Sequence, residues 1–200
     1  MKGYTKPLLI IFLVLLADQV LKTWIKTNMF MGQEFKIIGN WFIIHFTENN
    51  GMAFGLEFGG EFGKLALSLF RIAAVAGIGY GLHYLIQRKY HRGLILNVAL
   101  IFAGALGNII DSVLYGVIYG YAGWFHGRVV DMFYFPIWEG HFPSWFPIWG
   151  GEDFIFFRPV FNIADAAIST GVIIILVFQK TYFKEEFKEE IGPNNEIVEE

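Results

Sequence analysis

The chain has 200 residues, 55% of them hydrophobic, with a mean hydropathy of +0.48, which excludes an ordinary soluble domain and is typical of a membrane protein. A net charge of -3 at pH 7 and the lack of a basic stripe exclude a nucleic-acid partner. Because cysteine is absent, disulfides and thiolate nucleophiles are excluded too, so any catalysis must use carboxylates, hydroxyls, histidines or lysines.

Four segments are apolar enough to cross a bilayer, whose hydrocarbon core of about 30 Å requires roughly 20 mostly apolar residues. These predicted spans cover residues 7–26, 65–86, 94–115 and 159–178. Pro159 suits the first position of the last helix. We therefore predict a membrane α-helical protein with four transmembrane helices in a single domain, residues 1–180, and a charged cytoplasmic tail, residues 181–200.

Basic residues predict the orientation of the spans. The short connector 87–93 carries Arg88, Lys89 and Arg92, whereas the long segments 27–64 and 116–158 carry only four Lys or Arg together. The positive-inside rule then places both termini in the cytoplasm and the long segments outside.

The outer segments predict a small extracytoplasmic β-sheet and an outer surface loop. Residues 35–46 are rich in Ile, Phe and Trp and are interrupted by Gly39-Asn40, which indicates a hairpin. Residues 132–158 contain clusters of Pro, Trp and Gly and are too irregular to span the bilayer. We expect them to form a loop or lid over the outer surface.

Ionisable residues inside the spans are rare and energetically costly, so each is a candidate for function. At about 1.5 Å per residue, Asp18 and Lys22 lie roughly 18 and 24 Å from the cytoplasmic end. Asp111 lies roughly 27 Å from that end, and Asp165 roughly 9 Å below the outer surface. The polar residues of three helices therefore converge on one layer in the outer half of the membrane.

Two spacings recur within this layer. Asp18 and Lys22 are four residues apart and can form an ion pair on one helix face. An Asn-x-x-Asp spacing at 108–111 and again at 162–165 places an amide and a carboxylate on one face. Interhelical hydrogen bonding would explain one such pair, whereas two pairs at matched depth favour a functional site.

Other candidates are weaker. Asp131 follows the third span and could reach the same layer if the chain folds back, although a loop aspartate is usually solvated. His126 and His141 form no metal-ligand motif with the carboxylates, so we expect no metal. Ser112 and Ser169 lack a Gly-x-Ser-x-Gly elbow, which disfavours a serine nucleophile.

Five short motifs resemble, in order, those of the lipoprotein signal peptidases (signal peptidase II), bacterial aspartic peptidases of lipoprotein maturation. The resemblance covers most of residues 7–178, and five motifs in this order on a four-helix hydropathy profile are highly specific. They are DQVLK (18–22), ENNGMAF (48–54), GALGNIID (104–111), VVDM (129–132) and FNIADAAI (161–168).

The resemblance implies that Asp131 and Asp165 form the catalytic dyad, which spacing alone could not choose over Asp111. It implies substrate-binding or site-supporting roles for Asp18, Lys22, Asn49, Gly51, Asn108, Asp111, Asn162 and Ala164. We further expect a monomer without cofactors in the bacterial inner membrane, with membrane lipids as partners. This enzyme would cleave diacylglyceryl-modified prolipoproteins before the lipidated cysteine, near the outer face.

Two carboxylates held close share one proton and can activate a water for attack on a peptide carbonyl.

The alternative to a peptidase is a small proton-coupled transporter with a relay of ionisable residues, Asp18, Lys22, Asp111 and Asp165. A transporter predicts polar residues through the whole membrane thickness, yet the cytoplasmic half of each span nearly lacks them.

Two departures from the family pattern concern the site. The family usually has an arginine directly after the aspartate of the GALGN motif, and Ser112 occupies that position. Arg128 is a candidate to supply the missing charge, while Arg71, near the outer end of the second span, is expected to extend to the lipid headgroups. The segment between Asp131 and Asp165 is also longer than the family pattern predicts.

Overall fold

The computed structural model describes residues 3–50, 60–136, 138–141, 143–147, 151–156 and 159–183. The candidate Gly51 and residues 184–200 of the predicted tail lie outside this set.

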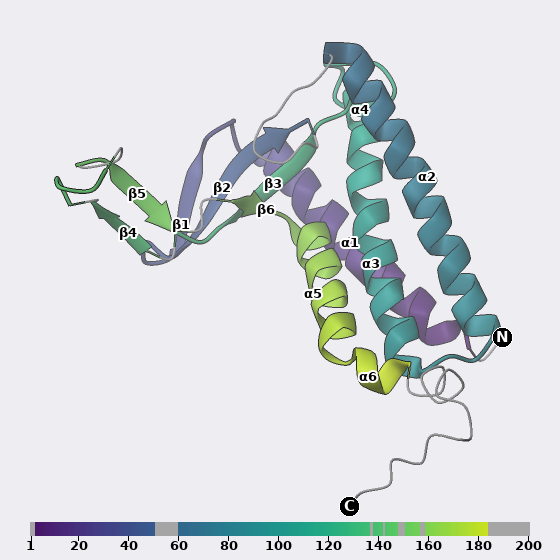
Figure 1. Ribbon diagram of the computed structural model, residues 1–200. Helices are drawn as coiled ribbons and strands as arrows, with labels where there is room; N and C mark the ends of the chain where they lie inside the picture. Colours follow the sequence, from purple (N-terminus) through teal and green to yellow (C-terminus); the bar gives the residue numbers. More distant parts are fainter. Residues whose placement is uncertain are drawn as a thin grey trace, which may run out of the picture.

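Three helices are long and apolar enough to cross a membrane, by length and composition: α1 (Thr5–Asn28), α2 (Gly60–Gln87) and α3 (Arg92–Ile110). They coincide with the first three predicted spans. The third helix continues through a π-helical turn, η2 (Asp111–Tyr115), into α4 (Gly116–Ile118). Helix α3 contacts α1, α2 and the last apolar helix of the chain, and so lies at the centre of the bundle (Figure 1).

Two small sheets lie at one end of the bundle (Figure 1). The larger is antiparallel, in the order β1-β2-β3-β6, and comprises β1 (Glu34–Ile38), β2 (Phe42–Asn49), β3 (Val129–Tyr134) and β6 (Val160–Phe161). The hairpin β1-β2 confirms the turn predicted at Gly39, whose φ of +53° favours glycine.

The segment expected to be an irregular outer loop contains further strands. Besides the end of β3, it includes β4 (Trp138–His141) and β5 (Asp153–Phe156), which pair antiparallel as the second sheet. The expectation of a loop throughout residues 132–158 was therefore wrong, because Trp138 to His141 find partners in Phe156 to Asp153.

The last apolar helix, α5 (Ile163–Val177), has 15 residues and is followed by α6 (Gln179–Tyr182). Its start differs from the prediction at Pro159. The residues before the helix pair with β3 as β6, and the Asn162 side chain then caps the helix by accepting a hydrogen bond from the Asp165 N–H at 2.9 Å. Strand pairing and this capping box shift the start to Ile163.

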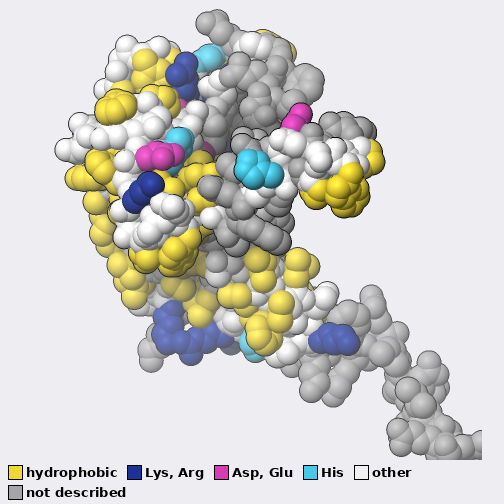
Figure 2. Space-filling model, turned by 90° about the vertical axis from the view of Figure 1, so that its left-hand side faces the viewer, with side chains coloured by type: hydrophobic (Ala, Val, Ile, Leu, Met, Phe, Trp, Pro, Cys, Tyr) yellow, Lys and Arg dark blue, Asp and Glu magenta, His cyan; other side chains and the backbone are white. Residues whose placement is uncertain are grey.

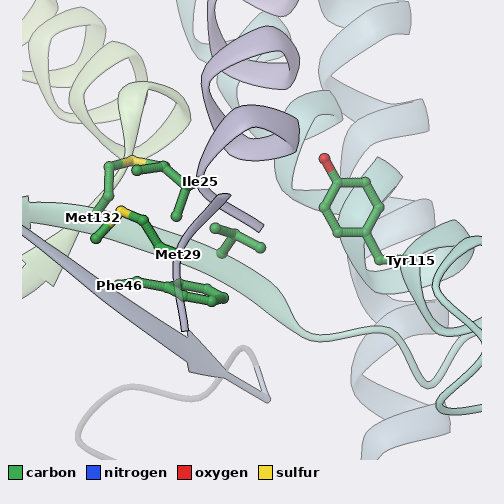
Figure 3. Packing of buried hydrophobic residues seen from close by; sticks show 6 residues of the cluster. Ile25, Met29, Phe46, Tyr115 and Met132 are labelled. Atoms are coloured by element: carbon green, nitrogen blue, oxygen red, sulfur yellow. The ribbon is translucent and has the colours of Figure 1, made fainter. Parts of the chain in front are cut away.

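An apolar cluster joins the large sheet to the bundle. Figure 3 shows Ile25 and Met29, at the end of α1, facing Phe46 of β2 and Met132 of β3. Each of these side chains is at most 7% exposed, and burying such a side chain stabilises the fold by about 1.5–3 kcal/mol. The cluster therefore fixes β3, the strand that carries Asp131, against the end of α1.

Small residues let α3 and α5 approach closely. A Cβ atom at Gly104 would lie 2.2 Å from the backbone oxygen of Ala164, and one at Gly107 would lie 3.3 Å from the Ala164 Cβ. Such contacts require glycine, as is common where membrane helices pack backbone to backbone.

We predict that Gly104→Ala lowers the free energy of unfolding by about 1–3 kcal/mol, because the new methyl group overpacks the α3–α5 contact. The measurement is the thermal unfolding midpoint in detergent. Gly77→Ala, in α2, is the matched control, because a Cβ there meets nothing within 4 Å. Equal midpoints for the two variants would contradict the close packing.

Candidate active site

A buried lysine lies at the centre of the polar layer. Lys22 is 0% exposed, and its Nζ lies 2.9 Å from Asp18 Oδ2 and 2.9 Å from Asp111 Oδ2. The same ammonium donates to Asn108 Oδ1 at 3.0 Å. Its three protons therefore all have acceptors, and the predicted Asp18–Lys22 pair becomes a cluster that joins α1 to α3.

Gln19 was not among the predicted site residues, yet it bridges the two carboxylates of this cluster. Its Nε2 donates to Asp18 Oδ2 at 3.1 Å and to Asp111 Oδ1 at 3.0 Å, and its Oε1 accepts from the Tyr115 hydroxyl at 3.1 Å. Its place inside the DQVLK motif, next to Asp18, was the available sequence signal.

Asp111 also links the bundle to the sheet. It begins the π-helical turn η2, a local widening often found at functional sites. Its Oδ2 accepts a hydrogen bond from the backbone N–H of Val130 at 3.3 Å. The strand β3 is therefore held against α3 at the residue next to Asp131.

Asp131 lies on β3 and is 2% exposed, in contrast to the solvated loop position considered from the sequence. Pairing of β3 with β2 and β6 explains the burial. Its carboxylate accepts from Asn162 Nδ2 at 2.7 Å and from the amide of Asn49. Burial, and secondly the negative charge of Asp165, raise the pKa of Asp131 to about 7.

The second carboxylate, Asp165, lies in the first turn of α5 and is half-buried. Its Oδ1 accepts from Asn108 Nδ2 at 2.8 Å, and its Oδ2 accepts from the Asn162 backbone N–H at 3.3 Å. Asp165 is therefore the more accessible of two carboxylates that interact electrostatically.

Asn162 contacts both carboxylates and the lysine cluster. In addition to its bond to Asp131, its Nδ2 lies 3.2 Å from Asn108 Oδ1 and 3.2 Å from the Val130 carbonyl oxygen. Its Oδ1 accepts from the Asp165 N–H. One asparagine thus fixes the start of α5 relative to β3, and with them the two aspartates.

The structure brings the described predicted site residues into one connected hydrogen-bonding network. Ala164 joins it through its backbone N–H, which donates to Asp18 Oδ1 at 3.0 Å. The network comprises Asp18, Lys22, Asn49, Asn108, Asp111, Asp131, Asn162, Ala164 and Asp165.

Arg71 points into the protein, so the expectation that it extends to the headgroups was wrong. Its Nη1 donates to the buried Ser112 Oγ at 3.3 Å, and its charge interacts with Asp165, Asp131 and Asp111.

Arg128, the candidate considered from the sequence, has other partners. It pairs with Glu48 at 3.7 Å and lies 5.7 Å from the centre of the Tyr121 ring. Of the two arginines, Arg71 is therefore the one whose charge acts on the two aspartates. Its location inside an apolar span was the signal that the sequence offered.

Comparisons with known proteins agree on one family. The family model described as Signal peptidase (SPase) II matches residues 10–181. The lipoprotein signal peptidase of Porphyromonas gingivalis is 52% identical over 184 residues, covering 84% of this chain and 80% of the relative. That of Amoebophilus asiaticus is 41% identical over 177 residues, covering 84% and 75%.

The fold is also similar to that of a solved bacterial membrane enzyme, determined by the in meso method. The TM-score is 0.59 at 30% sequence identity, and the match covers 87% of each chain.

We predict that Lys22→Met lowers the free energy of unfolding by about 3–5 kcal/mol, because two buried carboxylates lose their common cation. The measurement is unfolding in detergent at pH 7. Lys36→Met serves as the control, since Lys36 is exposed and its only acceptor among the described residues is Asn40; its effect should stay within about 0.5 kcal/mol. An equal decrease in the free energy of unfolding for both variants would show that the buried lysine stabilises the fold no more than an exposed one.

Proposed function

The chain belongs to the signal peptidase II family, and from this premise we propose that Asp131 and Asp165 are its catalytic dyad. The observation that carries the proposal is their shared partner: Asn162 binds the Asp131 carboxylate at 2.7 Å and caps the helix turn that carries Asp165. The two carboxylates are thereby held together without a cation in direct hydrogen-bonding contact with either, among the described contacts.

The protein is an aspartic endopeptidase of the bacterial membrane that cleaves the signal peptide from prolipoproteins. A pair of carboxylates suits this reaction, because peptide hydrolysis needs one group to accept a proton from water and another to donate one. We assign the proton that is donated to Asp131, because burial raises the pKa of this carboxyl to about 7.

In the proposed mechanism, Asp165 takes a proton from a water while the water oxygen bonds to the scissile carbonyl carbon, and Asp131 protonates the carbonyl oxygen. The tetrahedral intermediate then collapses and the C–N bond breaks. The leaving nitrogen receives the proton held by Asp165, and Asp131 recovers one from the hydroxyl group. The dyad returns to its initial protonation state, and no acyl-enzyme forms.

We propose four spans, with α5 as the fourth, and an active site towards the outer face. The connector rich in Lys and Arg lies between α2 and α3, at the end of the bundle away from the sheets (Figure 1). Positive-inside orientation puts that end, and both termini, in the cytoplasm. Val177, the last residue of α5, is twelve residues after Asp165, a rise of about 18 Å, which leaves the dyad about 12 Å below the outer boundary of a core of about 30 Å.

This depth suits a substrate anchored in the bilayer. We propose that the scissile bond precedes a cysteine carrying diacylglycerol, since acyl chains beside the spans contribute about 0.8 kcal/mol per buried methylene. Both aspartates and their asparagine partners come from one chain, so a monomer suffices.

The first experiment follows cleavage of a diacylglyceryl-modified prolipoprotein by purified wild type, Asp131→Asn and Asp165→Asn. Each variant should lose at least about 10³-fold in kcat, because each removes a group that transfers a proton. Glu34→Gln, which removes an exposed carboxylate on β1, is the control and should retain full activity. A folded Asp131→Asn enzyme with wild-type turnover would refute the dyad and redirect the search to Asp111.

The pKa of Asp131 predicts the pH dependence of the wild type. Asp131 carries its proton below pH 7 and loses it above, so kcat/KM should fall as the pH rises through about 7. Well above this value the fall should approach about tenfold per pH unit. The profile is measured from pH 5 to 9, with unfolding midpoints at each pH to exclude denaturation; constant kcat/KM from pH 6 to 9 would contradict the assignment of the proton.

Arg71 should influence the same titration. Arg71→Gln removes a positive charge that favours ionised carboxylates, so the decline in kcat/KM should move to higher pH, with Arg71→Lys in between. Arg128→Gln is the matched control and should leave the profile in place, because its charge is directed to Glu48. A change in unfolding midpoint without any shift of the profile would mean that Arg71 is only structural.

A further inference from the structure

A second polar feature lies at the opposite end of the bundle from the dyad. A cavity of about 350 Å³ opens between the start of α1, the end of α2 and the start of α3. Lys6, Lys89 and Arg92 contribute its charged lining, one from each helix or the adjoining turn. Ile86, Ile95 and Leu96 contribute apolar lining.

The three cations are exposed, and among the described residues no carboxylate pairs with them. Lys89 adopts a φ of +56°, a left-handed conformation uncommon for a residue with a side chain. The turn therefore retains a lysine where the backbone alone would favour glycine. Figure 2 shows Lys and Arg side chains gathered at this end, below the apolar surface of the helices.

The shape and position of the cavity restrict its ligand. Three positive charges around one concavity favour an anion, and the volume fits a small phosphorylated group. The apolar lining and the location at the ends of three apolar helices favour a ligand with a hydrocarbon portion. Basic pockets between membrane helices commonly bind anionic lipid headgroups.

We propose that this cavity binds the headgroup of an anionic phospholipid, whose phosphate lies among Lys6, Lys89 and Arg92 and whose glycerol end contacts the isoleucines. The lipid would connect the ends of three helices in the leaflet opposite the active site. The site is separate from the dyad, so the proposal does not depend on the catalytic assignment.

The test compares two double variants of the full chain in detergent. Lys89→Gln/Arg92→Gln removes two lining charges, whereas Arg88→Gln/Lys180→Gln removes one lysine and one arginine that do not line the cavity. Apparent affinity is measured by titrating phosphatidylglycerol and following bound lipid by native mass spectrometry. The lining variant should bind about 25-fold more weakly, roughly fivefold for each cation, and the control within about threefold of wild type.

Retained peptidase activity checks that both double variants are folded, since neither touches the dyad. Equal weakening in both would show general charge attraction and overturn the site. Phosphatidylcholine binding as tight as phosphatidylglycerol would overturn the requirement for an anion. Displacement of the lipid by inorganic phosphate at equal concentration would identify a soluble anion instead.

A chain ending at residue 183 tests one further occupant, because residues 184–200 include seven glutamates. Unchanged lipid affinity is expected. A severalfold rise in lipid affinity after truncation would mean that the acidic tail occupies the cavity in the full chain, and this would overturn the lipid proposal.

Discussion

The buried ammonium of Lys22 is the interaction on which the rest of the site depends. It faces Asp18 on its own helix and Asp111 on α3, and no other described cation forms an ion pair with either carboxylate. Separating the helices would leave buried charges without partners, at a cost of several kcal/mol. The position of α1 relative to α3 is therefore fixed by charge as well as by packing.

The same lysine orients the amides that hold the dyad. Because Asn108 Oδ1 accepts from Lys22, its Nδ2 must point the other way, towards Asp165. The Asn162 amide is oriented in the same way: because its Oδ1 caps α5, its Nδ2 points towards Asp131. The orientation of each amide follows from its partners, so neither amide can flip without losing at least three hydrogen bonds.

Close helix contact makes these short links possible. Gly104 lets the backbone of α5 approach α3, and Ala164 then reaches Asp18 through its N–H at 3.0 Å. The large sheet completes the site from outside the bundle, because the apolar cluster at the end of α1 fixes β3 and thereby Asp131. The packing of α5 against α3 therefore positions Asp165, and the docking of the sheet against α1 positions Asp131.

Local sequence determined the three long apolar helices and the β1-β2 hairpin, since apolar length and the Gly39-Asn40 turn act over a few residues. The constant rise of a helix likewise predicted that the polar residues of α1, α3 and α5 lie at one level of the bundle, where they form one network. Only the tertiary structure decided that Asp131 is buried, that Arg71 turns inward to Ser112, and that α5 starts after β6. Each depends on a partner distant in the chain, which no local pattern encodes.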